Sequence, residues 1–173
     1  MNLRIETARL ILRPAREADL ADMHAVLSSA EATRWWSTPP HPTIDVTREW
    51  LSAMIAGGGA GLDMVIERDG RVIGKAGCYR PPDLGYILHP DHWGQGLATE
   101  ALTAVLDRLF ATTGHAAATA DVDPENTASI RVVTKLGFVR TGFAERTWNV
   151  GGEWKDSVYY ALSREDWLAR ARP

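Results

Sequence analysis

The sequence predicts one α/β domain, and three observations in its 173 residues support that prediction. Segments with the pattern of strands alternate with segments of helical periodicity, which is typical of α/β proteins. Between residues 85 and 109 a strand runs through a glycine-spaced turn into a strongly amphipathic helix. The pair Asp69-Gly70 between two apolar runs is a strong hairpin signal. No internal repeat or interdomain linker is visible, so we expect residues 1–173 to form a single domain.

The first half of the chain is predicted to form two helices and four strands. These are a strand at 10–13, helices at 18–27 and 46–56, and strands at 62–67, 72–79 and 84–88. Pro14 ends the first strand, and the run Gly57-Gly58-Gly59 closes the second helix. Because Pro81-Pro82 interrupts the chain, the last of these strands is expected to enter the sheet at an angle.

The second half continues the alternation with two helices and three strands. These are a helix at 98–109, a strand at 116–121, a helix that begins at residue 124, and strands at 138–143 and 154–162. Asp123 followed by Pro124 predicts the N-cap and the first residue of the second helix, and Gly137 is expected to stop it.

The glycine-spaced turn before the helix at 98–109 is a candidate anion site. A helix start has N–H groups without intrahelical partners and the positive end of the peptide dipole, so it attracts phosphate. Gly94 and Gly96 lack the Cβ atoms that would keep a ligand away from the backbone. A purely structural turn is the alternative. The third glycine of the dinucleotide fingerprint is missing and no Gly-Lys-Ser/Thr follows, which excludes the Rossmann and P-loop patterns.

A second candidate lies on the helix that follows Asp123. Asn126, Ser129, Ile130 and Val133 share one face of this helix, so a polar pair opens an otherwise apolar face. Either the pair contacts a ligand, or Asn126 and Ser129 only satisfy the helix start.

Together the two segments resemble the GNAT superfamily of acetyl-CoA-dependent N-acetyltransferases. The sequence Trp-Gly-Gln-Gly-Leu-Ala at 93–98 lies where that family has Arg/Gln-x-x-Gly-x-Gly/Ala. Trp93 in place of the basic or amide residue, followed by Ala-Thr-Glu-Ala at 98–101, is similar to the RimJ/RimL type, the ribosomal-protein N-acetyltransferases. Residues 6–14 (Glu-Thr-Ala-Arg-Leu-Ile-Leu-Arg-Pro), the Asn126-x-x-Ser129 pair and Lys-Leu-Gly-Phe at 135–138 agree with that branch.

The resemblance implies the GNAT fold, a mixed and mostly antiparallel central sheet that is splayed at the acetyl-CoA site and flanked by helices. It implies that the thioester and pantetheine lie along the backbone of the strand before the turn, and that the diphosphate lies on the turn itself. The implied coenzyme-binding residues are Ile87, Leu88, Trp93, Gly94, Gln95, Gly96, Leu97, Ala98, Thr99, Asn126 and Ser129.

The chain departs from many members of this superfamily at two positions that matter for proton transfer. Val133 stands where many relatives have a tyrosine general acid, so the resemblance leaves Ser129 as the candidate hydrogen-bond donor to the sulfur. Asp83 stands where many relatives have a glutamate, two residues before the Gly-Tyr pair. We expect Asp83 either to act as a base, directly or through water, or to be only a charge at the strand edge.

The segment between the two early helices is rich in tryptophan and proline. Trp35 and Trp36 are predicted to contact the acceptor substrate, because the corresponding segment of the resembled family helps to wall the acceptor pocket. Tryptophans of this kind are also common core residues.

Composition and charge exclude several classes of function. The net charge of −3 without a basic run argues against DNA as a partner. Cys78 is the single cysteine, which excludes an internal disulfide and fits a reducing cytosol. No apolar stretch approaches about 18 residues, and Glu6 and Arg9 lie where a signal peptide would be apolar, so we expect a cytoplasmic protein without a membrane partner. The scattered histidines form no zinc pattern, so no metal is expected, and the Gly-x-Ser-x-Gly elbow of hydrolases is missing.

The sequence therefore predicts an enzyme that transfers an acetyl group from acetyl-CoA to a primary amine by direct attack. The amine is either a protein N-terminus or a small molecule. A module of the same fold that binds acyl-CoA without turnover is the alternative, because both proton-transfer positions are substituted. The protein is expected to be a monomer or a homodimer.

Overall fold

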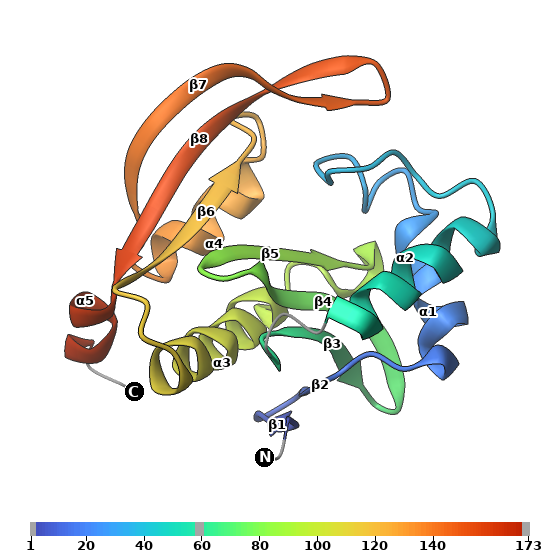
Figure 1. Cartoon of the computed structure of the whole chain (residues 1–173), viewed down its shortest axis with the longest axis horizontal. Helices are drawn as coiled ribbons and strands as arrows, with labels where there is room; N and C mark the ends of the chain where they lie inside the picture. Colours follow the sequence, from blue (N-terminus) through green and yellow to red (C-terminus); the bar gives the residue numbers. More distant parts are fainter. Residues whose placement is uncertain (1–2, 58–60, 171–173) are drawn as a thin grey trace.

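A computed structural model describes residues 3–57 and 61–170 of the chain. The described strands form one eight-stranded sheet in the order β1-β2-β3-β4-β5-β6-β8-β7 (Figure 1). They are β1 (Ile5–Glu6), β2 (Ile11–Arg13), β3 (Asp63–Arg68), β4 (Arg71–Arg80), β5 (Asp83–Leu88), β6 (Ala117–Val122), β7 (Val139–Val150) and β8 (Glu153–Ser163). All neighbouring strands are antiparallel except β5 and β6. The predicted mixed, mostly antiparallel sheet is confirmed.

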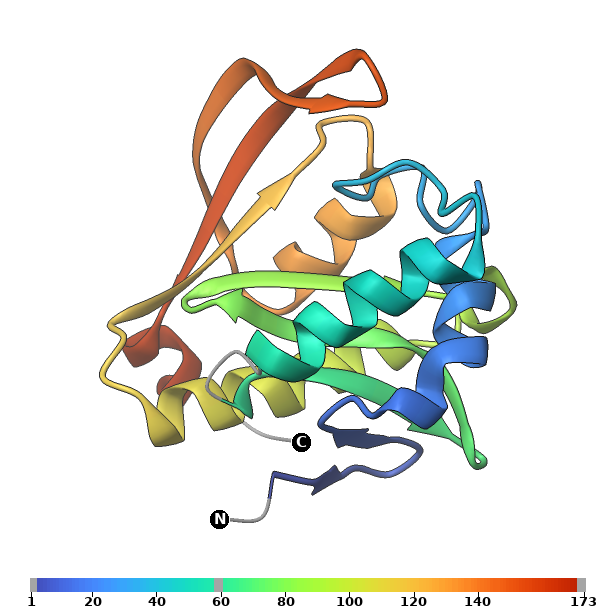
Figure 2. The same ribbon diagram turned by 45° about the vertical axis from the view of Figure 1, so that its right-hand side comes forward.

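Helices cover both faces of the sheet. They are α1 (Leu20–Leu27), α2 (Ile44–Gly57), α3 (Leu97–Thr112), α4 (Thr127–Lys135) and α5 (Arg164–Ala169), with short 3-10 turns η1 (Glu17–Asp19) and η3 (Pro90–His92). Met64 and Ile66 of β3 are buried in one core cluster with α3, while Val65 between them is buried in a second cluster with α1 and α2. This alternation places the two clusters on opposite faces of the sheet. Figure 2 shows α2 and α3 on opposite sides of β3 and β4.

The parallel pair β5 and β6 separates after two residues. Asp83 pairs with Thr119 and Leu84 with Ala120, and no further pairs connect the two strands. The remainder of β5 keeps its pairing with β4, where Gly74 lies opposite Leu88. The edge of β5 that faces β6 therefore has free backbone groups beyond Leu84, and the predicted splay of the sheet is confirmed.

The hairpin predicted at Asp69-Gly70 joins β3 and β4. Asp69 and Gly70 have φ values of 51° and 77°, the left-handed pair that a tight hairpin turn with the right twist requires. Of the glycine run predicted to close the second helix, Gly57 is the last residue of α2, whereas Gly58 and Gly59 lie outside the described residues.

The predicted start of the helix after residue 123 is wrong. Helix α4 begins at Thr127, and its N-cap is Asn126, whose side-chain Oδ1 accepts a hydrogen bond from the Ser129 N–H at 3.1 Å. Asp123 instead accepts a hydrogen bond from the Glu125 N–H at 2.8 Å, which makes a local turn before the helix. Aspartate and asparagine are both good N-cap residues, and in this chain Asn126 caps the helix.

Two other elements were not predicted, and one was predicted too short. No strong local pattern predicts the two-residue strand β1 or the helix α5. Strand β7 continues seven residues beyond the predicted end at 143, so β7 and β8 form a long hairpin that rises above the rest of the sheet (Figure 1). Among the described residues, no helix is both long and apolar enough to cross a membrane.

Candidate active site

A cavity of about 510 Å³ occupies the gap that opens between β5 and β6. Its walls come from β5 beyond its first residue, the turn at 92–94, the first residues of α3, the end of β6, α4 and the loop at 32–36. Most of the predicted coenzyme-binding residues line it: Ile87, Leu88, Trp93, Gly94, Gly96, Leu97, Ala98, Thr99, Asn126 and Ser129. Ile87 and Leu88 have buried side chains, and because the Ile87 carbonyl points toward Gly74 of β4, Leu88 is the one of the two whose backbone faces the gap.

The glycine turn has the conformation that an anion cradle needs. Gly94 and Gly96 have φ values of 69° and 74°, and Gly96 is the N-cap of α3. A Cβ on Gly94 would meet no atom within 4 Å, and a Cβ on Gly96 would meet only the Arg9 guanidinium at 3.7 Å. The space in front of both glycines is thus open for a ligand.

Gln95 does not line this cavity, in contrast to the other residues of the turn. Its side-chain amide donates to the Asp91 carbonyl at 3.1 Å, and its Oε1 accepts from Arg68 at 2.7 Å. The Gln95 carbonyl accepts from Arg9 at 2.8 Å. Because the C=O and N–H of a peptide plane point in opposite directions, this contact orients the Gly96 N–H away from Arg9. Gln95 therefore holds the turn, and its backbone is the part that a ligand can reach.

The N-terminal segment braces the same turn. Glu100 in the first turn of α3 accepts hydrogen bonds from the Thr7 hydroxyl at 2.6 Å and from the Arg9 guanidinium at 2.7 Å. Burial acts to raise the pKa of Glu100, but the hydrogen bonds from Thr7 and Arg9 outweigh it and lower that pKa. Thr7 and Arg9 of the motif at 6–14 therefore hold the glycine turn and the start of α3 in place.

Trp93 closes the turn against β5. Its indole Nε1 donates to the Leu88 carbonyl at 2.9 Å, while the ring is 44% exposed. One acceptor position of the Leu88 carbonyl is therefore already used within the protein.

Helix α4 contributes a hydroxyl pair to the cavity. The Tyr86 hydroxyl of β5 donates to Ser129 Oγ at 3.1 Å, and both residues line the cavity. Burial raises the pKa of Tyr86, and the contact with Ser129 acts in the opposite direction but is weaker. Tyr86 was not among the predicted site residues, because its pairing with Ser129 joins positions 43 residues apart in the chain.

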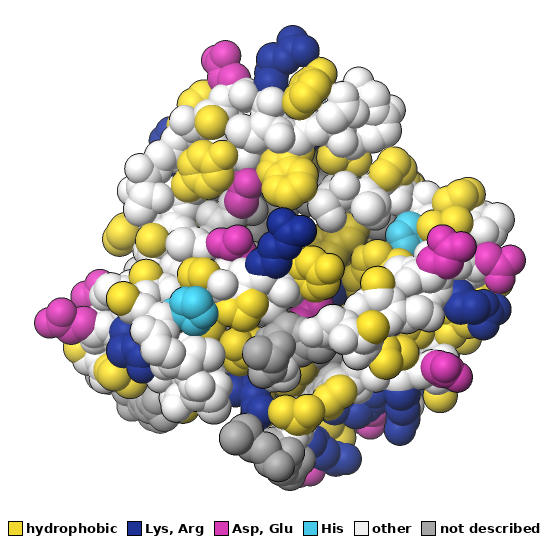
Figure 3. All heavy atoms as spheres, viewed as in Figure 1, with side chains coloured by type: hydrophobic (Ala, Val, Ile, Leu, Met, Phe, Trp, Pro, Cys, Tyr) yellow, Lys and Arg dark blue, Asp and Glu magenta, His cyan; other side chains and the backbone are white. Residues whose placement is uncertain are grey.

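A second cavity of about 860 Å³ lies beside the first, between the sheet, α2, the loop at 34–37 and the β7–β8 hairpin. Trp35 and Trp36 line both cavities, as their predicted contact with the acceptor requires. Trp36 also packs against the core cluster of α1 and α2. Figure 3 shows hydrophobic, acidic and basic side chains next to one another across the middle of this face.

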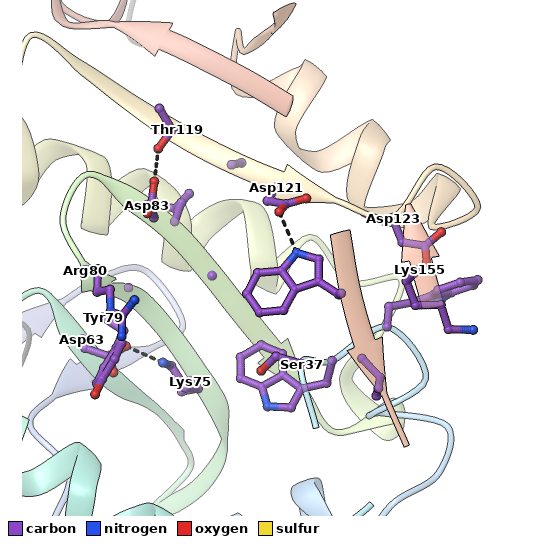
Figure 4. A pocket seen from close by; sticks show the side chains of 18 of the residues that line it. Ser37, Asp63, Lys75, Tyr79, Arg80, Asp83, Thr119, Asp121, Asp123 and Lys155 are labelled. Carbon is purple, nitrogen blue, oxygen red and sulfur yellow. Dashed lines mark hydrogen bonds and ion pairs between the residues drawn. The ribbon is translucent and has the colours of Figure 1, made fainter. Parts of the chain in front are cut away.

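Carboxylates on four strands line this second cavity, Asp63, Asp83, Asp121 and Asp156, and Figure 4 labels the first three. Asp63 forms an ion pair of 2.5 Å with Lys75, and both side chains are almost fully buried. Asp83 accepts a hydrogen bond from the Thr119 hydroxyl and does not line the first cavity. Asp121 accepts from the Trp148 indole at 2.8 Å.

The two cavities meet at the splay of β5 and β6. The residues that line both are Trp35, Trp36, Leu84, Gly85, Ala120, Asp121 and Asp123. Asp121 and Asp123 are the acidic members of this set, and neither was predicted as a site residue. A sequence signal existed, since alternation along β6 puts Asp121 on the face of Thr119, but only the sheet order shows which cavity that face lines.

Comparison with known proteins supports an acetyltransferase. A family model described as an acetyltransferase (GNAT) domain matches residues 9–139. The chain is 35% identical to the uncharacterized N-acetyltransferase YnaD of Bacillus subtilis (strain 168) over 49% of this chain and 50% of that protein, so it spans about half the length of that relative. It is 25% identical to the uncharacterized N-acetyltransferase p20 of Bacillus licheniformis over 93% of this chain and 96% of that protein. It is 34% identical to the ribosomal protein uS5-alanine N-acetyltransferase of Escherichia coli (strain K12) over 52% of this chain and 44% of that protein.

Solved structures share the whole architecture. RimL, a ribosomal L7/L12 α-N-protein acetyltransferase in complex with coenzyme A, matches with a TM-score of 0.80 and 20% identity over 94% of this chain and 99% of that chain. Spermidine N-acetyltransferase from Vibrio cholerae, in complex with CoA and spermine, matches with a TM-score of 0.76 and 20% identity over the same shares of the two chains. At this identity the likeness establishes the fold.

Proposed function

This chain belongs to the acetyltransferase (GNAT) family and is an N-acetyltransferase that uses acetyl-CoA, and from that premise we propose that it acetylates a primary amine by direct attack. The observation that carries the proposal is the meeting of two cavities at the splay of β5 and β6. One cavity has an anion cradle and a free strand edge, and the other has carboxylates and aromatic rings, which attract ammonium groups. A donor in the first and an amine in the second would meet at Gly85.

Acetyl-CoA fits the first cavity. Its diphosphate would lie on the backbone from Gln95 to Thr99, because Gly94 and Gly96 leave that backbone open. Its pantetheine amides would pair with the free edge of β5 at Leu88, as an added strand would, whereas the Ile87 carbonyl points toward Gly74 of β4 and Ile87 only lines the wall. The bound thioester supplies an acetyl group that an amine can attack. Asn126 would reach the pantetheine with its amide nitrogen, because its Oδ1 already caps α4.

Ser129 would donate a hydrogen bond to the coenzyme sulfur. Because the Tyr86 hydroxyl donates to Ser129 Oγ, the Ser129 proton is left to point elsewhere in the cavity. A chain of two hydroxyls also polarises the outer one, which strengthens its donation to a sulfur that gains charge as the bond to carbon breaks.

Ser129→Ala is expected to lower kcat by about tenfold or more while the Kd of acetyl-CoA stays nearly unchanged, because a hydrogen bond to a charged group is lost only as charge develops. Steady-state kinetics and calorimetry measure the two quantities. Asn126→Ala is the contrasting variant and should weaken coenzyme binding, with an added loss of about 1 kcal/mol in stability from the missing cap. Normal kinetics in both variants, with equal small losses of thermal stability, would leave the pair with a capping role only.

The acceptor would lie against Trp35, Trp36 and Asp83 in the second cavity. Asp83 has a carboxylate at the cavity wall, so it can hold a positive charge of the acceptor or take a proton from it. The Thr119 hydroxyl of β6 donates to Asp83 Oδ1 and so holds one of the two carboxylate oxygens in place. We propose that acceptor binding is the main role of Asp83, because Asp83 lines the acceptor cavity and does not line the coenzyme cavity.

The acceptor itself is a protein N-terminal amine or a small-molecule amine. The names of relatives support both, since one acts on a ribosomal protein and another on spermidine. The alternative of a binding module without turnover has no support among these relatives.

Release of free CoA from acetyl-CoA with a panel of amines tests the proposal. The panel contains peptides with free N-termini, amino acids, polyamines and arylalkylamines, and product mass identifies the acetylated compound. We expect CoA release that depends on the amine. One product should be about 42 Da heavier than its acceptor, because an acetyl group replaces a hydrogen atom on nitrogen. CoA binding without release with every amine would instead establish the binding module.

A further inference from the structure

Asp121 lies where β6 leaves β5. The last pair between the two strands joins Leu84 to Ala120, so Asp121 is the first residue of β6 beyond the paired region. Side chains alternate along a strand, which puts Asp121 on the same face as Thr119, whose hydroxyl binds Asp83. Asp121 lines both cavities, at the point where a donor and an acceptor would meet.

The Asp121 carboxylate is oriented but not neutralised. The Trp148 indole of β7 donates to its Oδ2 at 2.8 Å, and Figure 4 shows this contact inside the cavity. Among the described residues, no lysine, arginine or histidine forms an ion pair with Asp121. One oxygen is thus fixed by an aromatic N–H, and the other has no hydrogen bond within the described part of the chain.

Asp121 is better placed for chemistry than Asp83. Asp83 lines only the acceptor cavity, and its partner Thr119 lies two residues before Asp121 on β6. Two residues of a strand span roughly 7 Å, which is too far for Asp83 to contact an amine at the junction. Asp123 also reaches the junction, but its charge acts on the Lys155 ammonium, and one of its oxygens is bound to the Glu125 N–H.

We infer that Asp121, oriented by Trp148, binds the ammonium group of the acceptor at the junction and takes its proton. This inference rests on the proposed function. The ammonium first loses one proton to the Asp121 carboxylate, and the amine nitrogen then bonds to the acetyl carbon while the bond from that carbon to sulfur breaks. The second proton leaves the nitrogen and ends on sulfur by way of Ser129. Asp121 passes the first proton to water, so each turnover yields an amide, free CoA thiol and one released proton.

Asp121→Asn is the test variant, because the amide keeps the size of the side chain and an acceptor for the Trp148 N–H. With the best acceptor of the amine panel, we expect kcat to fall by about 10² to 10⁴, the usual contribution of a general base. Asp83→Asn should raise KM for the acceptor and change kcat much less. Asp45→Asn, on the exposed first turn of α2 with a side chain 79% exposed, is the control and should behave like the wild type.

Binding gives a readout that does not depend on turnover. Calorimetry of 2-phenylethylamine with the CoA complex should give a Kd about ten to a hundred times higher for Asp121→Asn than for the wild type, because a charge-assisted hydrogen bond is lost. The Kd of CoA should be the same in both proteins.

A less basic amine distinguishes proton transfer from positioning. In β,β-difluoro-2-phenylethylamine the shape is kept but the ammonium is far more acidic, so less help from a base is needed. We expect the ratio of wild-type to Asp121→Asn kcat to be much smaller with this amine than with 2-phenylethylamine.

The outcomes separate this inference from the proposed function. A wild-type protein that acetylates amines, with Asp121→Asn equal to it in kcat and in amine binding, overturns the inference and leaves the function intact. A large loss of kcat in Asp83→Asn alone assigns the proton transfer to Asp83 and also overturns the inference. Equal losses with both phenylethylamines reduce Asp121 to a positioning residue and contradict the proton transfer. A wild type that acetylates no amine overturns the function and the inference together.

Discussion

Gly96→Val is expected to weaken acetyl-CoA binding by more than tenfold. A valine is strained at the left-handed φ of 74°, and its Cβ would lie beside Arg9, which binds the Gln95 carbonyl, so the turn on which we place the diphosphate would change its shape. Several N–H groups of the turn would then lose a charged partner, and each such hydrogen bond contributes about 1.5–3 kcal/mol. A loss of only one of them already corresponds to about a tenfold rise in Kd. Calorimetry with acetyl-CoA measures the change.

The control for this variant must reproduce its backbone strain. A β-branched residue at the left-handed φ of 74° costs about 1–2 kcal/mol in stability, whatever the ligand does. Gly152 in the β7–β8 turn has a φ of 94°, and an added Cβ there would meet no atom within 4 Å. Gly152→Val should therefore lose stability in the same way but keep its affinity for acetyl-CoA. An unchanged Kd in Gly96→Val would remove the anion site from the glycine turn.

Lys75→Met is expected to destabilise the fold by about 3–5 kcal/mol. Lys75 and Asp63 form a buried ion pair at 2.5 Å, with side chains only 6% and 2% exposed. The Lys75 ammonium also lies 5.8 Å and 5.9 Å from the centroids of Trp36 and Trp50. Removing Lys75 alone leaves the Asp63 carboxylate buried without its cation, which is the costly case for a buried pair. Urea denaturation measures the loss in the free energy of unfolding.

Two further variants show whether the unpaired charge is the cause. The double variant Asp63→Leu/Lys75→Met removes both charges, so it should recover most of the lost stability. Lys155→Met breaks an exposed ion pair with Glu153 and should leave the urea midpoint unchanged. If the double variant is as unstable as Lys75→Met, packing against the two tryptophans explains the loss and the ion pair does not.

Elements with a strong local pattern were predicted well. The β3–β4 hairpin depends on Asp69-Gly70, which adopt left-handed φ values with little strain, and neighbouring residues are enough to encode such a turn. The start of α3 likewise follows from Gly94 and Gly96, because their conformational freedom and the apolar face of the helix are local properties. The start of α4 was missed, since Asp123 and Asn126 are both suitable caps and only the competing turn at Asp123 decides between them.

Contacts between distant segments could not be predicted. Arg9 binds the Gln95 carbonyl across 86 positions, and Tyr86 binds Ser129 across 43 positions. Such pairs depend on the order of the strands and on their register, and a shift of one residue would turn each side chain to the other face. This is why the sequence pointed to Ser129 but not to its hydroxyl partner, and to Asp83 but not to Asp121.

The sequence by itself determined the family and the segments that we propose to face the coenzyme, since a glycine turn and a helix start depend on residues that are adjacent in the chain. Only the tertiary structure decided that Asp121 reaches the junction of the two cavities and that Asp83 does not. That choice follows from the parallel pairing of β5 and β6 and from its end at Ala120, which leaves Asp121 at the opening and Asp83 behind it. Strand divergence is a property of two segments and their packing, so neither segment encodes it alone.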